Sequence, residues 1–470
     1  MSSDKTSVNK AIENIEKLLG KERNISAPLK AAIKLIIVLI KILSDRINLN
    51  SSNSSKSPST DQKRKRGSKT KKSSKKQGGQ SGHAGVRLKK IDNPDKIIKI
   101  KLDKRTLPRG EYQEVGFETR QEFDINISRV VIEYQAQILE DETGKRFVAE
   151  FPKHIKKDAQ YGIGVKVNSV YMSQFQLIPY LRIQDQFADQ MDLPLSTGSI
   201  FNFNKEAYNL LEEFEEIAKD NLVNSELSHV DETSININKK RYWLHTASNE
   251  LWTHFYPHEK RGSEAMDDIG IIPNFKGILC HDHWKAYYKY KCLHALCNAH
   301  HKRELTRAEE QDNQKWAKVM KNLLLEINKA VDKAGGKLRK SQANDYLNRY
   351  RKILSDGDKE CPEPKRKKGQ KGRLKRSKSR NLLERLREFE KDTLRFMENK
   401  IVPFTNNLAE NDLRMTKVQQ KISGCFRSLE GAYIFCRVRG YLSTCRKRGV
   451  GATEALTLLF QGKLPDFVKK

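Results

Sequence analysis

Three short acidic blocks stand far apart in this chain, and each has the residue types of one part of a metal-dependent nuclease site. They read HVDET at 229–233, CHDHW at 280–284 and NNLAEND at 406–412. Asp231 and Asp282 each follow a short apolar run that is typical of a strand end, whereas Glu410 opens a helical run rich in Arg and Lys. Two such aspartates and one helical acid can hold two Mg²⁺ ions against a phosphodiester. The pattern predicts an enzyme that cuts or joins DNA.

The segment that carries Glu410 is predicted to be a helix with two different faces. Pro403 ends the preceding helix, and Thr405 or Asn406 can cap the next one. Helical spacing places three cations on the face of Glu410: Arg414, Lys417 and Lys421. Together with Arg427 further along the chain, they are expected to hold DNA phosphates. A broadly opposite face is apolar and is expected to pack on a core: Leu408, Met415, Val418 and Ile422.

Glu410 and Asp231 also have ordinary structural explanations. Glu410 and Arg414 are spaced for a helical salt bridge, which contributes only about 0.2–0.5 kcal/mol. Asp231 can cap a turn at the end of its strand. His281 and His283 flank Asp282, and in a strand they point to the opposite face, so they are poor co-ligands for the same ion.

Four residues between 292 and 301 have the types that bind zinc: Cys292, Cys297, His300 and His301. Their spacing is loose, and residues 292–296 alternate like a buried strand. We favour a core strand followed by histidines at the start of a helix, and we expect no zinc there.

The composition favours a nucleic-acid partner. The net charge is +31, from 90 Lys and Arg against 59 Asp and Glu, which attracts a polyanion. All seven cysteines lie at or after Cys280 and form no secreted disulfide framework, as expected in a reducing cytoplasm. The first residues lack a signal-peptide pattern. The most apolar stretch, 35–40, is far shorter than the roughly 20 residues of a membrane span, so no membrane partner is expected.

Residues 1–50 are predicted to contain a coiled-coil helix. Apolar residues recur at alternating spacings of four and three: Leu29, Ile33, Ile36, Ile40, Leu43 and Ile47. Ser26 can cap this helix, and Pro28 suits its first turn. The stripe can pack within its own domain, but we favour a homo-oligomer. The segment that follows, 51–90, is a basic, low-complexity linker that cannot supply a core, and we expect a disordered arm that grips DNA phosphates.

Two smaller units are predicted between 91 and 224. Residues 91–160 alternate in polarity, as in 130–134, and indicate a small β-rich module. Residues 161–224 are helical. Within them, a helix at 179–190, a turn with Pro194 and a second helix that starts near 196–199 have the form of a helix-turn-helix, which can place its second helix in a major groove. A packed helical hairpin gives the same pattern.

Strands and helices alternate from 225 to 306. Strands are expected at 228–237, 242–247, 251–256 and 277–280, and helices at 262–269 and 284–290. An α/β layer of this kind places sites at the ends of its strands. Residues 307–355 are helical, a basic loop spans 361–380, and a further helix runs from 381 to about 400. The fold class is therefore multidomain α/β.

The chain resembles the IS66 family of bacterial insertion-sequence transposases. The blocks that carry the resemblance read GGQSGH at 78–83, HVDET at 229–233, KRGSEA at 260–265, GILCHDHW at 277–284, CLHALCNAHH at 292–301 and VPFTNNLAENDLRMTKVQQKISGCFRS at 402–428. They follow the expected order and cover most of 78–465, and the last block is long and specific.

The resemblance implies a DDE recombinase with Asp231, Asp282 and Glu410 as its catalytic triad and metal ligands. It implies two Mg²⁺ ions, with Mn²⁺ as a substitute, and an RNase H-like core whose first part is 225–306 and whose catalytic helix lies in 401–470. The long gap before Glu410 then marks 307–400 as a helical insertion. The coiled coil and the helix-turn-helix are implied as well.

The implied partners are the transposon ends, target DNA and other copies of the chain, and there is room for accessory proteins of the same element. The location implied is the bacterial cytoplasm, on the nucleoid when DNA is bound. One departure stands out. Family members usually carry a cysteine-paired zinc module before the helix-turn-helix, and here no cysteine precedes Cys280. The module at 91–160 is therefore expected to be zinc-ribbon-like without its metal.

Two other functions remain open from the sequence. A catalytically inactive remnant or regulator of the same element would bind DNA without turnover, and the intact triad argues against it. A basic structural RNA-binding protein explains the charge but gives no reason for the three acids, and it predicts no requirement for a divalent ion.

Overall fold

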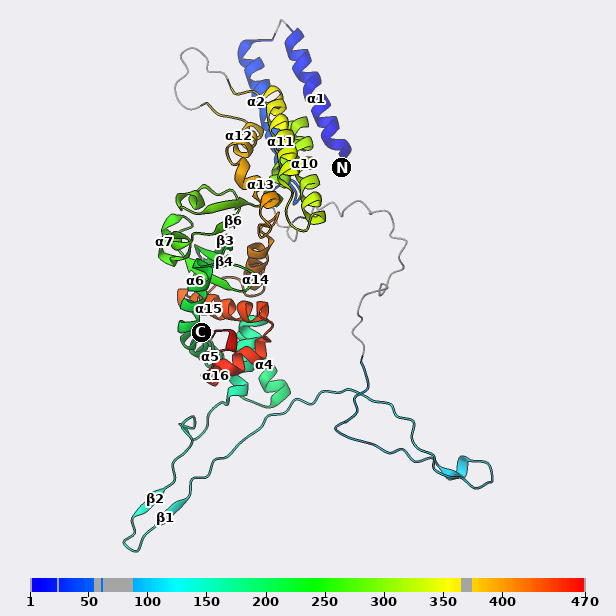
Figure 1. The fold of residues 1–470 in the computed structure, drawn as a ribbon, viewed down its shortest axis with the longest axis vertical. Coiled ribbons are helices and arrows are strands. Elements are labelled where there is room, and N and C mark those ends of the chain that lie inside the picture. Colours follow the sequence, from blue (N-terminus) through cyan, green and yellow to red (C-terminus); the bar gives the residue numbers. More distant parts are fainter. Residues whose placement is uncertain (1, 23–24, 55–60, 62–87, 365–373, 469–470) are drawn as a thin grey trace.

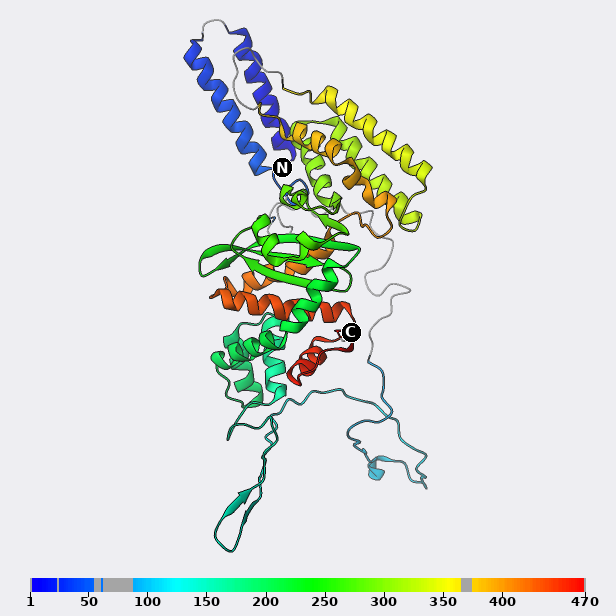
Figure 2. The same cartoon turned by 60° about the vertical axis from the view of Figure 1, so that its left-hand side comes forward.

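The computed structural model describes residues 2–22, 25–54, 61, 88–364 and 374–468 (Figure 1). Most of the expected basic arm at 51–90 and the centre of the basic loop at 361–380 lie outside the described residues. The described chain is mixed α/β, with one five-stranded sheet among many helices (Figure 2). Among the described helices, none combines the length and the apolarity needed to cross a membrane.

The central sheet has the strand order β5-β4-β3-β6-β7. Its strands are β3 (Leu227–Ile237), β4 (Lys240–Ser248), β5 (Thr253–His258), β6 (Ile278–His281) and β7 (Leu293–Leu296). The first three form an antiparallel meander, and β6 and β7 run parallel to β3. The strands expected at 228–237, 242–247 and 277–280 are confirmed. The strand expected at 251–256 begins later, because Asn249 Oδ1 accepts the backbone N–H groups of Leu251 and Trp252 and holds them in a turn.

Two short helices and a 3₁₀ turn connect the later strands. They are α7 (Ser263–Ile269), α8 (Ile271–Asn274) and η3 (Lys285–Lys289). They confirm the helical segments expected at 262–269 and 284–290, the second as a 3₁₀ turn.

One group of helices shares a core with the sheet. It comprises α3 (Ile163–Val170), the π-helical turn η2 (Tyr171–Phe175), α4 (Tyr180–Met191), α5 (Thr197–Leu210), α6 (Glu212–Val223), α15 (Leu429–Lys447), α16 (Ala452–Phe460) and the 3₁₀ turn η4 (Asp466–Val468). Figure 2 shows α15 between the sheet and the other helices of this group. Phe187, Phe214 and Tyr441 are buried in the same cluster as Val230 and Leu279 of the sheet.

The two helices expected at 179–190 and after 196 are α4 and α5. Ser196 Oγ accepts the backbone N–H of Ser199 at 3.0 Å and caps α5, where the second helix was predicted to start. Ile183 of α4 and Ile200 of α5 are fully buried in the shared core. Whether α5 enters a DNA groove stays a prediction.

The described residues between 298 and 398 form a helical layer. Its helices are α9 (Asn298–Asp312), α10 (Lys315–Lys333), α11 (Lys340–Glu360), α12 (Lys378–Glu388) and α13 (Glu390–Glu398). Trp316, Tyr350 and Leu383 are buried in one cluster with Cys280 and Ala295 of the sheet. This layer therefore packs against β6 and β7.

The helix α14 (Asn407–Ser423) lies against β3 and β4. Its buried residues are Ala409, Leu413 and Thr416. The apolar face predicted from the sequence was therefore partly wrong: Met415 and Val418 are partly buried against a cluster that includes Leu413, but Ile422 is 46% exposed. Ala409 and Thr416 are small, so the helix can approach the strands on that side.

At the N-terminus, α1 (Ser2–Lys21) packs beside α2 (Ala27–Ile47). Ser26 Oγ accepts the backbone N–H of Leu29 at 3.4 Å, as predicted for the cap of α2. Helix α1 covers one flank of the apolar stripe, where Ile37 is buried and Ile33 partly buried. The rest of the stripe is between 40% and 58% exposed: Leu29, Ile36, Ile40, Leu43 and Ile47.

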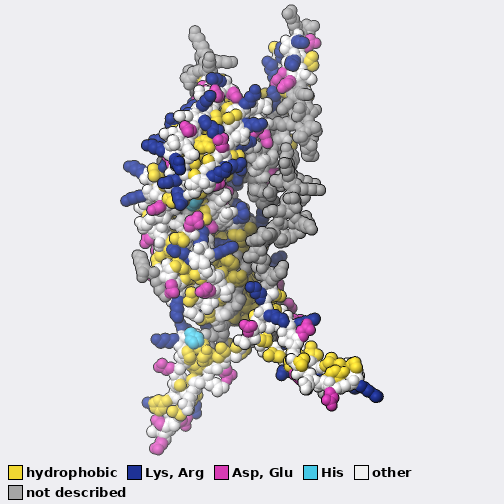
Figure 3. Space-filling model, turned by 45° about the vertical axis from the view of Figure 1, so that its right-hand side comes forward, with side chains coloured by type: hydrophobic (Ala, Val, Ile, Leu, Met, Phe, Trp, Pro, Cys, Tyr) yellow, Lys and Arg dark blue, Asp and Glu magenta, His cyan; other side chains and the backbone are white. Residues whose placement is uncertain are grey.

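The stretch 88–160 is extended and runs away from the helical body (Figure 1). Its regular elements are the 3₁₀ turn η1 (Lys104–Thr106) and one antiparallel hairpin, β1 (Ile138–Glu140) with β2 (Arg146–Val148). Many of its apolar side chains lie on the surface, as Figure 3 shows, with Val115 98% exposed. The β-rich module expected at 91–160 thus amounts to one hairpin here and stays a prediction.

Candidate active site

Asp231 and Asp282 lie at equivalent positions of two neighbouring strands. Strands β3 and β6 pair in parallel from Leu227 with Ile278 to His229 with Cys280. Two residues further on, the same register places Asp231 beside Asp282. Adjacent strands lie about 4.8 Å apart, so the two carboxylates come from neighbouring backbone positions.

The sequence indicated that Asp231 lies at the end of its strand, but the strand continues beyond it. Strand β3 continues to Ile237 through its pairing with β4, in which Asp231 lies opposite Thr246. The parallel partner β6 is the strand that stops here, at His281, so Asp282 is the first residue beyond it. The site therefore lies where the parallel ladder ends and the antiparallel hairpin continues.

The electrostatics at Asp231 are those of crowded acids. Burial raises the pKa of Asp231 well above its usual range, and the charges of Glu232, Asp282 and Glu410 raise it further. Asp231 Oδ1 accepts the backbone N–H of Glu232 at 2.9 Å, and Asp282 Oδ1 accepts that of Trp284 at 3.0 Å. In the part of the chain that the structure describes, the salt bridges of this region to Lys or Arg belong to Glu232 and Asp412, and none includes Asp231 or Asp282.

Asn406 fixes the start of α14 to β3. It occupies the N-cap position, but its side chain does not cap the helix. Asn406 Nδ2 donates to the carbonyl of Val230 at 2.8 Å, and Nδ1–H of His229 donates to Asn406 Oδ1 at 2.7 Å. Glu410 follows one turn later, its backbone N–H bonded to the carbonyl of Asn406. The third acid thus stands on a helix tied to the residue before Asp231.

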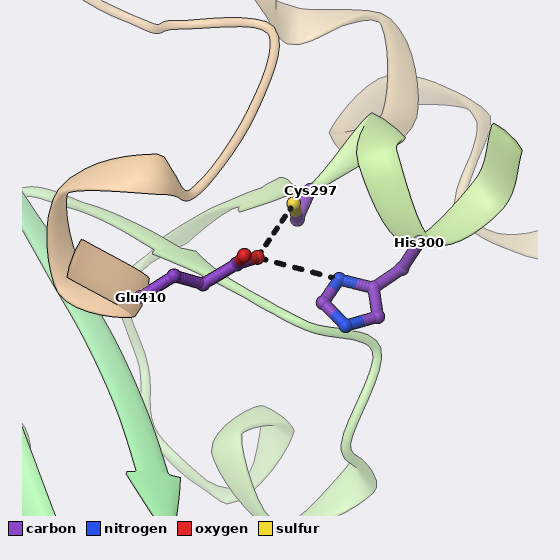
Figure 4. A group of neighbouring side chains, drawn as sticks. All are labelled: Cys297, His300 and Glu410. Atoms are coloured by element: carbon purple, nitrogen blue, oxygen red, sulfur yellow. Dashed lines mark hydrogen bonds and ion pairs between the residues drawn. The ribbon is translucent and has the colours of Figure 1, made fainter. Parts of the chain in front are cut away.

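Glu410 also faces two residues from the start of α9 (Figure 4). Its Oε1 lies 3.7 Å from Cys297 Sγ and 3.9 Å from His300 Nδ1. The donor atoms of these three residues all lie within 4.8 Å of one another, and among the described residues no other group of three meets that spacing. The charges of Asp282 and Glu410 act on Asp231, so the three acids lie in one region. Their carboxylate oxygens do not all lie within 4.8 Å of one another, unlike the donor atoms of Cys297, His300 and Glu410.

The other two residues of the Cys/His block lie elsewhere. Cys292 is near His294, at 4.0 Å between Sγ and Nε2, and the buried His301 bonds through Nδ1 to Asn298 Oδ1 at 3.0 Å. The alternating run expected from 292 to 296 forms β7, and the helix expected to start at the histidines is α9.

Glu232 is a further acid at the site that the sequence reasoning missed. Its side chain is 0% exposed, and it accepts two hydrogen bonds from Arg261, at 2.8 Å and 2.5 Å, and one from the Tyr287 hydroxyl at 2.5 Å. The guanidinium of Arg261 lies between the rings of Trp243 and Trp284, at 4.8 Å and 4.3 Å from their centroids. Strand alternation could have indicated that Glu232 faces away from Asp231, but not that Arg261 pairs with it.

The cations expected on α14, and Arg427 just beyond it, are placed in two ways. Arg414, Lys421 and Arg427 are exposed. Lys417 is half-buried, and its Nζ donates to the carbonyl of Ser234 at 2.6 Å, so part of its hydrogen-bonding capacity is used by β3.

Two family models match parts of this chain. The family model described as "Transposase IS66 family" matches residues 159–434, more than half of the chain and the part that includes all three acids. A second model, described as a family of unknown function (DUF6444), matches residues 3–89. A search of curated proteins gives no match. The chain therefore belongs to the IS66 family of transposases, enzymes that bind DNA and cut and transfer it in transposition.

Proposed function

We propose that Asp231, Asp282 and Glu410 are the catalytic carboxylates of a DDE transposase that cleaves the ends of its element and joins them to a target. The observation that carries the proposal is the arrangement of the three acids: Asp231 follows the part of β3 that pairs with β6 and Asp282 follows β6, their charges and that of Glu410 interact, and Asn406 anchors the helix of Glu410 to β3. Such an arrangement brings acids that are remote in sequence to one edge of a sheet.

The carboxylates fit a pair of divalent ions. Burial raises the pKa of Asp231, the nearby charges of Glu232, Asp282 and Glu410 raise it further, and no described Lys or Arg forms a salt bridge with Asp231 or Asp282. A divalent cation would relieve this repulsion, and carboxylate oxygens are the ligands that Mg²⁺ prefers. Asp231, Asp282 and Glu410 are the residues that would hold such ions. When bound, two Mg²⁺ ions, or Mn²⁺ in their place, supply Lewis acidity to the attacking and the leaving oxygen.

The residues of the chain then have separate roles. Asp231 and Asp282 hold ions from neighbouring strands, and Glu410 completes the site from α14. Arg414, Lys417, Lys421 and Arg427 contact the DNA backbone, with the larger share carried by the exposed arginines, because Lys417 Nζ also bonds to Ser234. Trp284 positions Asp282 through its backbone N–H.

The surrounding elements fit the same proposal. The meander β5-β4-β3 extended by two strands parallel to β3 supports an RNase H-like core. The layer from α10 to α13 stands between the second and third acids as an insertion. Helices α4 and α5 are proposed to read DNA as a helix-turn-helix, and the exposed stripe of α2 to pair with a second copy of the chain.

The test is a cleavage assay on labelled end DNA of the element with purified variants. Asp231→Asn, Asp282→Asn and Glu410→Gln are expected to reduce Mg²⁺-dependent cleavage to background while end binding, measured by gel shift, persists. Glu264→Gln, a change of an exposed acid on α7, is the matched control and should cleave as the wild type does. Cleavage by any of the three triad variants at the wild-type rate would refute the assignment. A wild-type protein that binds ends and never cleaves would indicate the regulator instead.

A further inference from the structure

We propose that Cys297, His300 and Glu410 form a site for a thiophilic divalent cation such as Zn²⁺, and that an ion bound there withdraws Glu410 from Mg²⁺-dependent cleavage. The first half of this proposal is independent of the catalytic assignment. The second half rests on the proposed function, because it requires Glu410 to be a ligand of the catalytic ions.

Two of the three ligands come from one helical turn. Cys297 is the N-cap residue of α9 and His300 lies in its first turn, with the His300 backbone N–H bonded to the Cys297 carbonyl at 3.1 Å. Side chains at these two positions of a helix start lie close together. The local fold therefore fixes the Cys-x-x-His pair before any ion binds.

The third ligand is held in place from the opposite side. The backbone N–H of Asn406 donates to Cys297 Sγ at 3.1 Å, which joins the start of α14 to the start of α9. The carbonyl of Phe404 accepts the backbone N–H of Asn298 at 3.1 Å and strengthens the same junction. Glu410 consequently points at Cys297 and His300, as Figure 4 shows.

The distances are close to those of a tetrahedral zinc site. Zinc bonds of about 2.3 Å to sulfur and about 2.0–2.2 Å to nitrogen and oxygen place S and O about 3.6 Å apart and N and O about 3.4 Å apart. Here the Sγ to Oε1 distance is 3.7 Å and the Nδ1 to Oε1 distance is 3.9 Å. A contraction of about half an ångström between Nδ1 and Oε1 brings that pair to the zinc value, and Sγ and Nδ1 lie within 4.8 Å of each other. Three protein ligands leave a fourth position for water, as in open zinc sites.

The donor chemistry separates this group from a magnesium site. Thiolate sulfur and imidazole nitrogen favour Zn²⁺, whereas Mg²⁺ prefers oxygen ligands. Nδ1 of His300 is buried and, within the described residues, has no hydrogen-bond partner, although it faces Glu410. A buried ring nitrogen without a partner is an unused metal ligand. On binding, the Cys297 thiol gives its proton to solvent and its sulfur coordinates the ion.

Binding is tested with Co²⁺ as a spectroscopic probe on the full-length protein. The wild type should show a thiolate-to-Co²⁺ charge-transfer band that Zn²⁺ abolishes by displacement. Cys297→Ser should lose the band while keeping an acceptor for the Asn406 N–H, and His300→Ala should weaken Co²⁺ binding by about tenfold or more. Cys292→Ser and Cys425→Ser, which change cysteines outside the group, are the matched controls and should leave the band unchanged.

A wild-type protein without a thiolate band, or a band that survives Cys297→Ser, would overturn the metal site. Thermal melts establish whether each variant is folded. If Cys297→Ser does not fold, Co²⁺ binding by His300→Ala tests the site instead.

Coupling to catalysis is tested by the ratio of cleavage rates with and without micromolar Zn²⁺ in excess Mg²⁺. The wild type should be inhibited, Cys297→Ser should be inhibited far less, and the Cys292→Ser control should behave as the wild type. A Co²⁺ band without Zn²⁺ inhibition would overturn the withdrawal of Glu410. A wild type that never cleaves in Mg²⁺ would contradict the proposed function instead, and the Co²⁺ titration would still decide the metal site.

Discussion

The side-chain amide of Asn406 donates a 2.8 Å hydrogen bond to the backbone carbonyl of Val230, the residue before Asp231. Asn406 is 2% exposed, and its other side-chain atom accepts from His229. One buried amide thus joins the helix of the third acid to the strand of the first. This contact therefore helps to set the separation between Asp231 and Glu410.

Replacing Asn406 with Ala should therefore damage both stability and cleavage. It leaves the Val230 carbonyl and the His229 ring without a partner, which costs about 1–3 kcal/mol in the free energy of unfolding. Cleavage in Mg²⁺ should fall further than DNA binding, because Glu410 loses its anchor. Asn407→Ala changes the exposed neighbour and should alter stability by less than about 0.5 kcal/mol. Urea denaturation and the end-cleavage assay measure the two effects. Equal stability and equal cleavage rates of the Asn406→Ala and Asn407→Ala variants would contradict the role of Asn406 in joining α14 to β3.

Asp231→Asn should stabilise the metal-free protein while it abolishes cleavage. The variant removes one of four crowded charges, and a gain of about 0.5–2 kcal/mol is expected in EDTA. Mg²⁺ should stabilise the wild type, by about 2.7 kcal/mol at a hundred times its Kd, and the variant much less. Thermal melts with and without Mg²⁺ test this. A variant that is less stable than the wild type in EDTA would argue against crowding at Asp231.

The pH dependence follows from the same group. The folded pKa of Asp231 lies above the value of about 3.9 in an unfolded chain, so the native state binds more protons between the two values. The stability of the metal-free wild type should therefore fall as pH rises from about 4 through the raised pKa. Asp231→Asn should remove that part of the slope.

Arg261→Ala should destabilise the fold beside the site. It leaves the fully buried carboxylate of Glu232 without its cation and opens the gap between Trp243 and Trp284. Because Arg261 itself is 39% exposed, the expected cost is about 1–3 kcal/mol rather than the larger value of a fully buried pair. Lys260→Ala, an exposed neighbour, is the control. If urea midpoints of the two variants agree, the Glu232–Arg261 pair does not stabilise the fold.

Much of the sheet could be predicted from the sequence because its signals are local. The apolar runs located β3, β4 and β6, and Ser26 was predicted as the cap of α2 from its neighbours alone. The packing face of α14 was partly misplaced, since periodicity cannot tell which of two half-apolar faces a sheet will cover. The contacts of Glu410 with Cys297 and His300 join segments more than a hundred residues apart, and no local pattern encodes them.

The exposed arginines of the Glu410 helix region should dominate DNA contacts there. Each phosphate contact adds about 0.9 to the slope of log affinity against log salt for duplex DNA. The double change Arg414→Ala and Arg427→Ala should therefore reduce that slope by up to about 1.8. Lys417→Ala should reduce it less and should lower stability by about 1 kcal/mol, because Lys417 Nζ bonds to Ser234. Gel shifts at several salt concentrations measure these slopes. A larger loss of slope for Lys417→Ala than for the double arginine variant would contradict the larger share assigned to the arginines.

The exposed stripe of α2 should mediate self-association. Ile40→Asp places a charge in the stripe, where Ile40 is 40% exposed, and should shift the protein toward the monomer in analytical ultracentrifugation. Ala31→Glu changes an exposed residue outside the stripe and should leave the oligomer intact. A wild type that is already monomeric at assay concentrations would contradict this role of α2.

The central claim is that Asp231, Asp282 and Glu410 together hold the catalytic ions, and anomalous diffraction from crystals soaked in Mn²⁺ tests it most directly. Two Mn²⁺ peaks are expected among the three carboxylates, with at least one carboxylate oxygen of each residue within about 2.0–2.3 Å of an ion. Peaks that involve only one of these residues, or carboxylates too far apart to share a pair of ions, would contradict the account.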